Sequence, residues 1–390
     1  MDFKLPRWPS YTEEEKRKVE EIIASGNVNY LYGFEGKSFE KEFAQFAGTK
    51  HAICIANGSL ALSVALHALK IGNGDEVITT PRTFIATASS IVLAGAKPVF
   101  ADVDRNSGNI TEKTIRQKLT SRTKAIIVVH LAGWPAEMNS IKTLAKEHNI
   151  KLIEDCAQAH GAEIEGKSVG SFGDVAAWSF CTDKIISTLG EGGMITTNDN
   201  NIWNSIWSYK DHGKSYESVF LKKHPPGFRW LHEGFGNNFR LTEIQSAVGR
   251  IQLSKLKKCT EDRQRNAMIL FSKLDKFSSL RIPLTEDLNQ HAWYKFYAYL
   301  EPKALLSDWT RDRIINEINN IGMPAFSGSC SEIYLENAFR NSVFNQKDRL
   351  ENAKELGETS LSFLVHQTIS EDQMENYAEK IENIIKKATK

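Results

Sequence analysis

The stretch "WSFCTDKIISTLGEGGMITTND" (residues 178–199) places a lysine at an unusual position. An apolar run over 175–181 predicts a buried strand, and three glycines between 190 and 193 predict a tight turn into a further strand. Lysine side chains are almost never buried unless they are paired. Lys184 lies between the two predicted strands, in a segment too short for an ordinary solvated loop, so it is the first candidate for a functional residue.

Outward from this stretch, short apolar runs rich in β-branched residues alternate with helical patterns. The expected strands are 52–56, 76–80, 97–103, 124–130, 150–155, 174–180 and 194–197, and helical patterns lie between them at 59–71, 84–94, 136–148 and 201–210. Buried strands separated by helices are typical of a mostly parallel sheet. The alternation fades near residue 246, after which a long helical stretch (242–276) leads into mixed elements. We therefore expect a large α/β domain over 1–245 and a smaller α+β domain over 246–390.

The composition argues against a nucleic-acid-binding, membrane-spanning or disulfide-rich protein. The 390 residues include 49 basic and 48 acidic side chains, so the net charge of +1 gives no electrostatic reason to expect nucleic acid or a membrane as partner. No apolar stretch approaches the length that spans a bilayer. Five scattered cysteines without a CxxC pair suggest neither a zinc site nor a disulfide framework. We expect reduced thiols in a cytoplasmic protein that holds no metal.

Chemically informative residues follow the carboxyl ends of the predicted strands, where open parallel sheets bind their ligands. They are Gly58 and Ser59 at a helix start, Phe84, Asp155, Gln158, Ser179 and Lys184. Taken one at a time, each has a plain structural explanation as a helix cap, a loop residue, a core ring or a surface charge.

As a set, these residues match the groups of pyridoxal phosphate (PLP). A helix N-terminus with Gly58 and Ser59 offers N–H groups to a phosphate, and Ser179 adds a hydroxyl. Phe84 offers a flat face to a ring. Asp155 is suited to keeping a ring nitrogen protonated, and Lys184 to forming an imine with an aldehyde. The same lysine would then carry protons to and from the substrate's amino-bearing carbon.

Several motifs resemble the DegT-type (DegT/DnrJ/StrS) sugar aminotransferases over nearly the whole chain. They include "IEDCAQAHGA" (153–162), "SFCTDKIISTLGEGG" (179–193) and "FGNNFRLTEIQ" (235–245). The resemblance implies fold type I of the PLP-dependent enzymes, which is the aspartate aminotransferase-like fold. By motif, Lys184 resembles the Schiff-base lysine and Asp155 the partner of the pyridine nitrogen. Gln158 corresponds to the residue beside the ring, Phe84 to the residue stacked on it, and Gly58, Ser59 and Ser179 to the phosphate-binding positions.

The resemblance also implies partners and substrates. Asn238 matches an asparagine that reaches the phosphate of a neighbouring subunit, which implies a homodimer with shared active sites. Such enzymes move an amino group from L-glutamate to a keto group of a nucleotide-linked, commonly deoxygenated sugar, for lipopolysaccharide O-antigen or other surface glycans. We predict substrate contacts from a set of aromatic and basic residues: Tyr30, Tyr32, Trp134, His212, Arg229 and His366.

The segment 209–236 is longer and richer in histidine and aromatic residues than in the shortest members of the family. Because it precedes Asn238, one hypothesis places it at the active-site entrance, where it would help to select the sugar nucleotide. The other hypothesis is a plain surface excursion.

Three other functions are consistent with parts of the sequence. A PLP-dependent sugar 3-dehydratase would share the fold, but one such branch carries histidine in place of Lys184, so the lysine favours transamination. A non-catalytic regulator would not need Lys184, Asp155 and Ser179. A nicotinamide-dependent enzyme would carry G-x-G-x-x-G between the first strand and its helix, and the sequence has none there.

Overall fold

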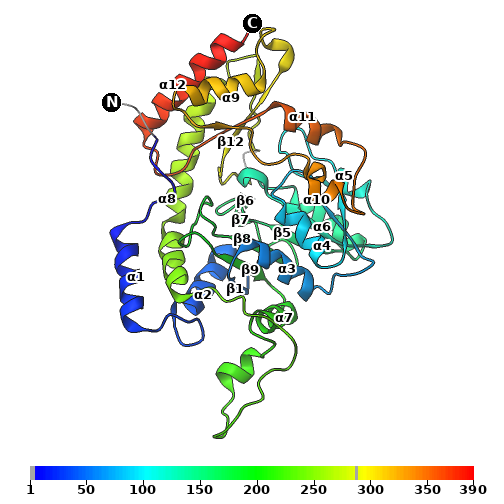
Figure 1. The fold of residues 1–390 in the computed structure, drawn as a ribbon, viewed down its shortest axis with the longest axis vertical. Helices are drawn as coiled ribbons and strands as arrows, with labels where there is room; N and C mark the ends of the chain where they lie inside the picture. The colour runs from blue at the N-terminus through cyan, green and yellow to red at the C-terminus, as the bar shows by residue number, and fades with distance from the viewer. Residues whose placement is uncertain (1–4, 286–288) are drawn as a thin grey trace.

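A seven-stranded sheet forms the centre of the molecule in the computed structural model, which describes residues 5–285 and 289–390 (Figure 1). Its strands lie in the order β1 (His51–Ile55), β9 (Gly193–Thr197), β8 (Val175–Ser179), β5 (Lys151–Asp155), β4 (Thr123–Val129), β2 (Glu76–Thr79) and β3 (Lys97–Phe100). Only β9 runs antiparallel to its neighbours. The predicted, mostly parallel sheet is confirmed.

Helices before, between and after these strands complete the large α/β part. They are α2 (Glu35–Ala47), α3 (Gly58–Ala68), α4 (Ala86–Leu93), α5 (Glu112–Arg116), α6 (Met138–Glu147) and α7 (Asn200–Lys210), with the short elements η1 (Leu131–Gly133), β6 (Glu163–Ile164) and β7 (Lys167–Ser168). Every residue of β2, β8 and β9 is buried. Strands buried on both faces need apolar, β-branched residues throughout, which is why the sequence shows continuous runs there.

The long helix α8 (Glu243–Leu274) joins the two parts of the molecule (Figure 1). It begins at a capping box in which the Thr242 hydroxyl accepts from the Gln245 N–H and the Gln245 side chain accepts from the Thr242 N–H. The N-terminal helix α1 (Glu13–Ser25) packs along α8 and starts where Glu15 accepts from the Thr12 N–H. The start of α8 agrees with the helical stretch predicted from residue 242.

A four-stranded antiparallel sheet builds the smaller part, in the order β10 (Leu280–Arg281), β12 (Phe296–Leu300), β14 (Ser360–Phe363) and β13 (Ala325–Phe326). Around it lie β11 (Asn289–Gln290), η3 (Pro302–Ala304), α9 (Arg311–Asn320), η4 (Ile333–Leu335), α10 (Asn337–Arg340), α11 (Glu351–Thr359) and α12 (Glu371–Ala388). A separate hydrophobic core here includes Leu270 and Leu274 of α8. The domain boundary at 245 stays a prediction.

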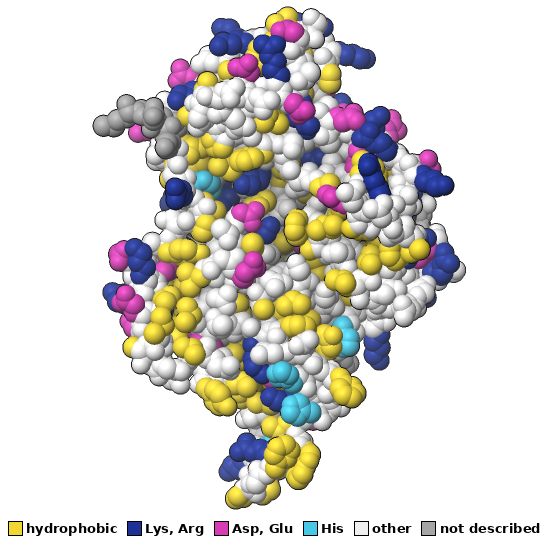
Figure 2. Space-filling model, viewed as in Figure 1, with side chains coloured by type: hydrophobic (Ala, Val, Ile, Leu, Met, Phe, Trp, Pro, Cys, Tyr) yellow, Lys and Arg dark blue, Asp and Glu magenta, His cyan; other side chains and the backbone are white. Residues whose placement is uncertain are grey.

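Residues 213–236 project from the body of the molecule between α7 and α8 and include the short π-helix η2 (Glu217–Leu221) (Figure 1). Figure 2 shows hydrophobic, basic and histidine side chains gathered at this end. Large apolar side chains are exposed along the projection: Leu221, Phe228, Trp230 and Phe235. At its root, the Arg240 guanidinium donates to both carboxylate oxygens of Asp211, at 2.8 and 3.0 Å.

Within the described part of the chain, no helix combines the length and the apolar character needed to cross a bilayer. The five cysteines are all free, and two of them, Cys54 and Cys156, are buried.

Candidate active site

A cavity of about 470 Å³ opens at the carboxyl ends of β5 and β8. It brings together the seven residues that the sequence singled out at the strand ends: Gly58, Ser59, Phe84, Asp155, Gln158, Ser179 and Lys184. The cavity therefore lies where open α/β sheets bind their ligands. Asn238 is exposed at the root of the projection and does not line this cavity.

Lys184 lies on the loop after β8, with its side chain only 14% exposed. The loop closes where the Thr182 N–H donates to the Gly190 carbonyl, and Gly190 has the left-handed φ of 110° that favours glycine. The Lys184 amine lies 3.8 Å from the Asp183 carboxylate and 5.1 Å from the Tyr294 ring centroid. The tight turn explains the unusual position of Lys184 in the sequence, because the turn keeps the lysine at the wall of the cavity.

Asp155 ends β5 on the buried side of the cavity. One carboxylate oxygen accepts from the Thr87 hydroxyl at 2.8 Å and the other from the Ala157 N–H at 3.1 Å. Burial raises the pKa of this carboxyl, and the two hydrogen bonds act against that rise. A cationic group next to Asp155 would lower the pKa further and stabilise the carboxylate.

The strand end that carries Asp155 is fixed by its buried neighbour Glu154. The Glu154 carboxylate accepts from the N–H groups of Gly170, Phe172 and Gly173 and lies 3.1 Å from the His130 ring. Burial raises the pKa of Glu154, but the hydrogen bonds from His130 and the backbone outweigh it and lower the pKa overall. Glu154 therefore holds the 170–173 loop against β5 and keeps the Asp155 backbone in place.

The N-terminus of α3 forms the opposite end of the cavity. The Asn57 side chain accepts from the Leu60 N–H, and among the described residues no acceptor takes up the N–H groups of Gly58 and Ser59. A Cβ on Gly58 would lie 2.7 Å from the Cβ of Ser179, so only glycine fits at this close approach. Free N–H groups at a helix N-terminus and a neighbouring hydroxyl are a ready-made phosphate site.

Two further residues line the space between these ends. Phe84 has 65% of its surface exposed, far more than a core ring, and it lines the cavity. The Gln158 amide oxygen accepts from the Ala132 N–H at 2.7 Å, which orients the side chain. An exposed aromatic face and an oriented amide suit a flat heteroaromatic ring.

The donor set therefore fits PLP: an amine for its aldehyde, a buried carboxylate for its ring nitrogen and a helix N-terminus for its phosphate. The model of the DegT/DnrJ/EryC1/StrS aminotransferase family matches residues 9–382. The chain belongs to this family. It is a PLP-dependent aminotransferase, as the resemblance in its motifs predicted.

This DegT-family aminotransferase is similar in sequence to enzymes named for nucleotide-linked aminosugars, and in structure to a solved aminotransferase. The chain is 37% identical over 319 residues to the dTDP-3-amino-3,6-dideoxy-alpha-D-galactopyranose transaminase of Aneurinibacillus thermoaerophilus, covering 80% of this chain and 82% of that one. It is 40% identical over 251 residues to the GDP-perosamine synthase of Escherichia coli O157:H7, covering 63% and 65%. The solved structure of an aminotransferase from Psychrobacter cryohalolentis superposes with a TM-score of 0.97 at 51% identity, covering 98% and 99%.

Of the predicted substrate contacts in this aminotransferase, Tyr30 lies in the core. Its ring is 1% exposed, its hydroxyl donates to Glu40 at 3.0 Å, and the buried Lys210 amine lies 4.0 Å from its centroid. Burial argues against contact between Tyr30 and a substrate. Tyr32, two residues on, is 81% exposed and also lies outside the Lys184 cavity.

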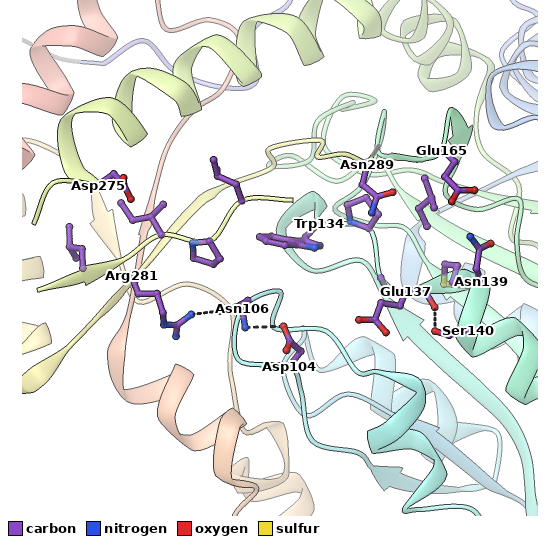
Figure 3. Close-up of a pocket in the computed structure, with 18 of the residues that line it drawn as sticks. Asp104, Asn106, Trp134, Glu137, Asn139, Ser140, Glu165, Asp275, Arg281 and Asn289 are labelled. Carbon is purple, nitrogen blue, oxygen red and sulfur yellow. Dashed lines mark hydrogen bonds between the residues drawn. The ribbon is translucent and has the colours of Figure 1, made fainter. Parts of the chain in front are cut away.

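Trp134 lines a different and larger cavity of about 980 Å³, which contains neither Lys184 nor Asp155. Figure 3 shows the Trp134 ring in this cavity, which Arg281 and Asn106 also line. Cavity size alone would therefore misplace the active site, whereas the chemistry of the lining residues does not.

The remaining predicted contacts are spread over the surface and the small part of the molecule. His212 and Arg229 are exposed, at the root and on the tip of the projection. His366 is buried against Trp8, and burial lowers its pKa to about 3. No residue of 209–236 lines either of the two cavities described around Lys184, and the role of this segment in selecting the sugar nucleotide stays a prediction.

A second cavity of about 500 Å³ shares Phe84, Gln158 and Lys184 with the first. Its far wall comes from the C-terminal part of the chain and includes Tyr294, Lys295, Tyr297, Phe326, Ser329 and Glu336. None of these residues was predicted, because Tyr294, Lys295 and Tyr297 lie in "HAWYKFYAYL" (291–300), whose pattern indicates only a strand, and the others follow no predicted strand. The basic residue within this aromatic stretch was the one available signal.

Proposed function

We propose that this aminotransferase moves an amino group from L-glutamate to a keto group of a nucleotide-linked, commonly deoxygenated sugar, in the assembly of O-antigens or other surface glycans. The observation that carries the proposal is one cavity that joins Lys184, Asp155 and the N-terminus of α3 and continues into a second cavity large enough for a substrate. The relatives named for dTDP- and GDP-linked aminosugars support the substrate class.

Each residue has a defined task in this proposal. PLP supplies the electron sink for the charge that develops on the substrate's amino-bearing carbon. Lys184 would hold the aldehyde of PLP, and its Nζ would take the proton from that carbon and return one. Asp155 keeps a proton on the ring nitrogen through its buried carboxylate. Because the Lys184 side chain is only 14% exposed, bulk water competes little for the transferred proton.

The other cofactor contacts orient the ring. We assign the phosphate to Gly58, Ser59 and Ser179. Phe84 would stack on the ring, and Gln158 would lie beside it. The free N–H groups of α3, the exposed face of Phe84 and the oriented amide of Gln158 support this assignment.

We further propose a homodimer with shared active sites, located in the cytoplasm. Asn238 would then bind the phosphate of the neighbouring subunit. Its exposure at the root of an apolar projection supports this role, since Phe228 and Trp230 expose 79% and 86% of their surfaces.

Purified holoenzyme, glutamate and a panel of UDP-, dTDP- and GDP-linked keto sugars test the proposal. We expect 2-oxoglutarate and an aminated sugar in equal amounts, with one nucleotide class preferred. Deoxygenation at C3 without amination would instead establish the sugar 3-dehydratase. A colourless protein that binds neither PLP nor glutamate would leave the non-catalytic regulator as the remaining hypothesis.

A further inference from the structure

The cavity next to Lys184 contains a second lysine, whose amine has no ionic partner. Lys295 is half-buried just before β12, and its Nζ lies 5.2 Å from the Tyr294 ring centroid. The Lys184 amine lies 5.1 Å from the same centroid, so both amines lie close to one aromatic ring. Within residues 5–285 and 289–390, no carboxylate forms an ion pair with Lys295 and no acceptor takes a hydrogen bond from its Nζ.

Two cations, Lys184 and Arg263, act on Lys295, and the carboxylates of Asp183 and the exposed Glu336 also line the cavity. Asp183 accepts from the Tyr294 hydroxyl and pairs with Lys184, so its carboxylate is already engaged. The buried Arg263 donates to Gln367 and to the Trp293 carbonyl, which are both neutral. Burial, together with repulsion from Arg263, lowers the pKa of Lys295 to about 8, so the amine is still mostly charged at neutral pH.

An unpaired, half-buried cation is costly unless a ligand compensates it. The ligand that matches is an oxyanion, and both proposed substrates carry one. The carboxylate of an amino acid is attached to the carbon that bears the reacting amine, so it must lie close to Lys184. The diphosphate of a sugar nucleotide is separated from the reacting carbon by the sugar ring.

We propose that Lys295 is a substrate-binding residue that takes the α-carboxylate of the amino-acid donor. The inference rests on the proposed function and assigns the donor half of the same site. The Lys295 amine donates a charge-assisted hydrogen bond to the carboxylate, and both Lys295 and Lys184 lie beside the Tyr294 ring.

The two half-reactions of purified holoenzyme separate the possible ligands. The variants are Lys295→Gln, which removes the charge, Lys295→Arg, which keeps it, and Lys303→Gln, a control on an exposed lysine of the same part of the molecule. Single-turnover consumption of glutamate and single-turnover amination of the keto sugar nucleotide are followed at varied substrate concentrations. Glutarate, a dicarboxylate without an amine, is titrated calorimetrically as a readout that needs no turnover.

For Lys295→Gln we expect the half-saturating glutamate concentration to rise at least about tenfold, with half-saturation by the sugar nucleotide unchanged. Glutarate binding should weaken in parallel, and Lys295→Arg should restore most of both losses. A shift confined to the sugar nucleotide would assign the diphosphate and overturn the inference, as would unchanged glutamate and glutarate binding. Failure of every keto sugar while glutamate still reacts would contradict the proposed acceptor and leave this inference standing.

Discussion

Lys184 is held at its backbone as well as at its side chain. Its carbonyl accepts from the Trp8 indole N–H at 2.8 Å, and its amine lies near Tyr294 and Asp183. We expect Lys184→Ala to abolish the visible absorption of the PLP imine and to reduce amination by at least about a hundredfold, because both the covalent link and the proton carrier are lost. Absorption spectra and 2-oxoglutarate release check this, with Lys303→Ala as control; a variant that stays yellow and active would contradict the role of Lys184.

We expect the charge of Lys295 to make the reaction with glutamate depend on pH. Its pKa of about 8, set by burial and by Arg263 and Lys184 against the attraction of Asp183, means that the free enzyme loses this charge as the pH rises through 8. We expect kcat/KM for glutamate to fall above pH 8 in the native chain, and the fall to be shifted to higher pH in Lys295→Arg, since arginine stays protonated. Steady-state kinetics between pH 6 and 10 decide this, and identical profiles for the two proteins would contradict it.

Sequence reasoning succeeded where a residue lies at the end of a predicted strand or a few positions after it. Asp155 and Ser179 lie at strand ends, Lys184 lies on the loop that follows, and all three line one cavity. Tyr294 and Lys295 could not be placed, because they approach Lys184 only after the two parts of the molecule pack together across more than a hundred residues of sequence. Thr87 was missed because a buried threonine that orients a carboxylate resembles any other helix residue.

Among the elements, the root of the projection couples α7 to α8. Asp211 follows α7 with no exposed side-chain surface, and Arg240 lies just before α8. We expect Arg240→Ala to lower the free energy of unfolding by about 3 kcal/mol, because it leaves a buried carboxylate with weaker pairing. It should also speed PLP loss on dialysis, since the backbone of Asn238 bridges to Asp211.

Denaturant unfolding and cofactor retention test the Arg240 prediction, and Arg116→Ala removes an exposed ion pair as a control that should change little. An Arg240→Ala protein as stable as the native one would show that Lys214, 3.4 Å from Asp211, compensates fully.

The seven strands of the large sheet were all predicted, because each is a continuous apolar run. The two-residue strands β6, β7, β10, β11 and β13 were not, since a pair of residues carries no periodicity. The helical stretch from 242 and the helix start at Gly58 and Ser59 were predicted, and the structure adds the side chains that cap these helices, Thr242 for α8 and Asn57 for α3.

For the whole molecule, the projection is the least predictable feature. Its composition indicated an unusual segment, but no pattern in the sequence specifies the direction in which the segment projects. We expect Phe228→Asp with Trp230→Asp to convert the proposed homodimer to a monomer without loss of folding, because both rings are exposed in the isolated chain. Light scattering and far-UV circular dichroism measure this, and Val343→Asp, at a 91% exposed position, is the control. A double variant that stays dimeric would place the interface elsewhere.

The contact between Trp8 and Lys184 has a practical consequence. The same indole lies 5.9 Å from the Arg263 guanidinium of α8 and stacks near His366, at 6.4 Å, so one fluorophore touches the reactive loop, the connecting helix and the smaller part of the molecule. We expect the fluorescence of Trp8 to change when the cofactor binds, and the difference spectrum against Trp8→Phe would separate that signal from the other tryptophans. Cleavage of the chain between Trp8 and α1 should reduce this fluorescence change and weaken the hydrogen bond that holds the Lys184 carbonyl.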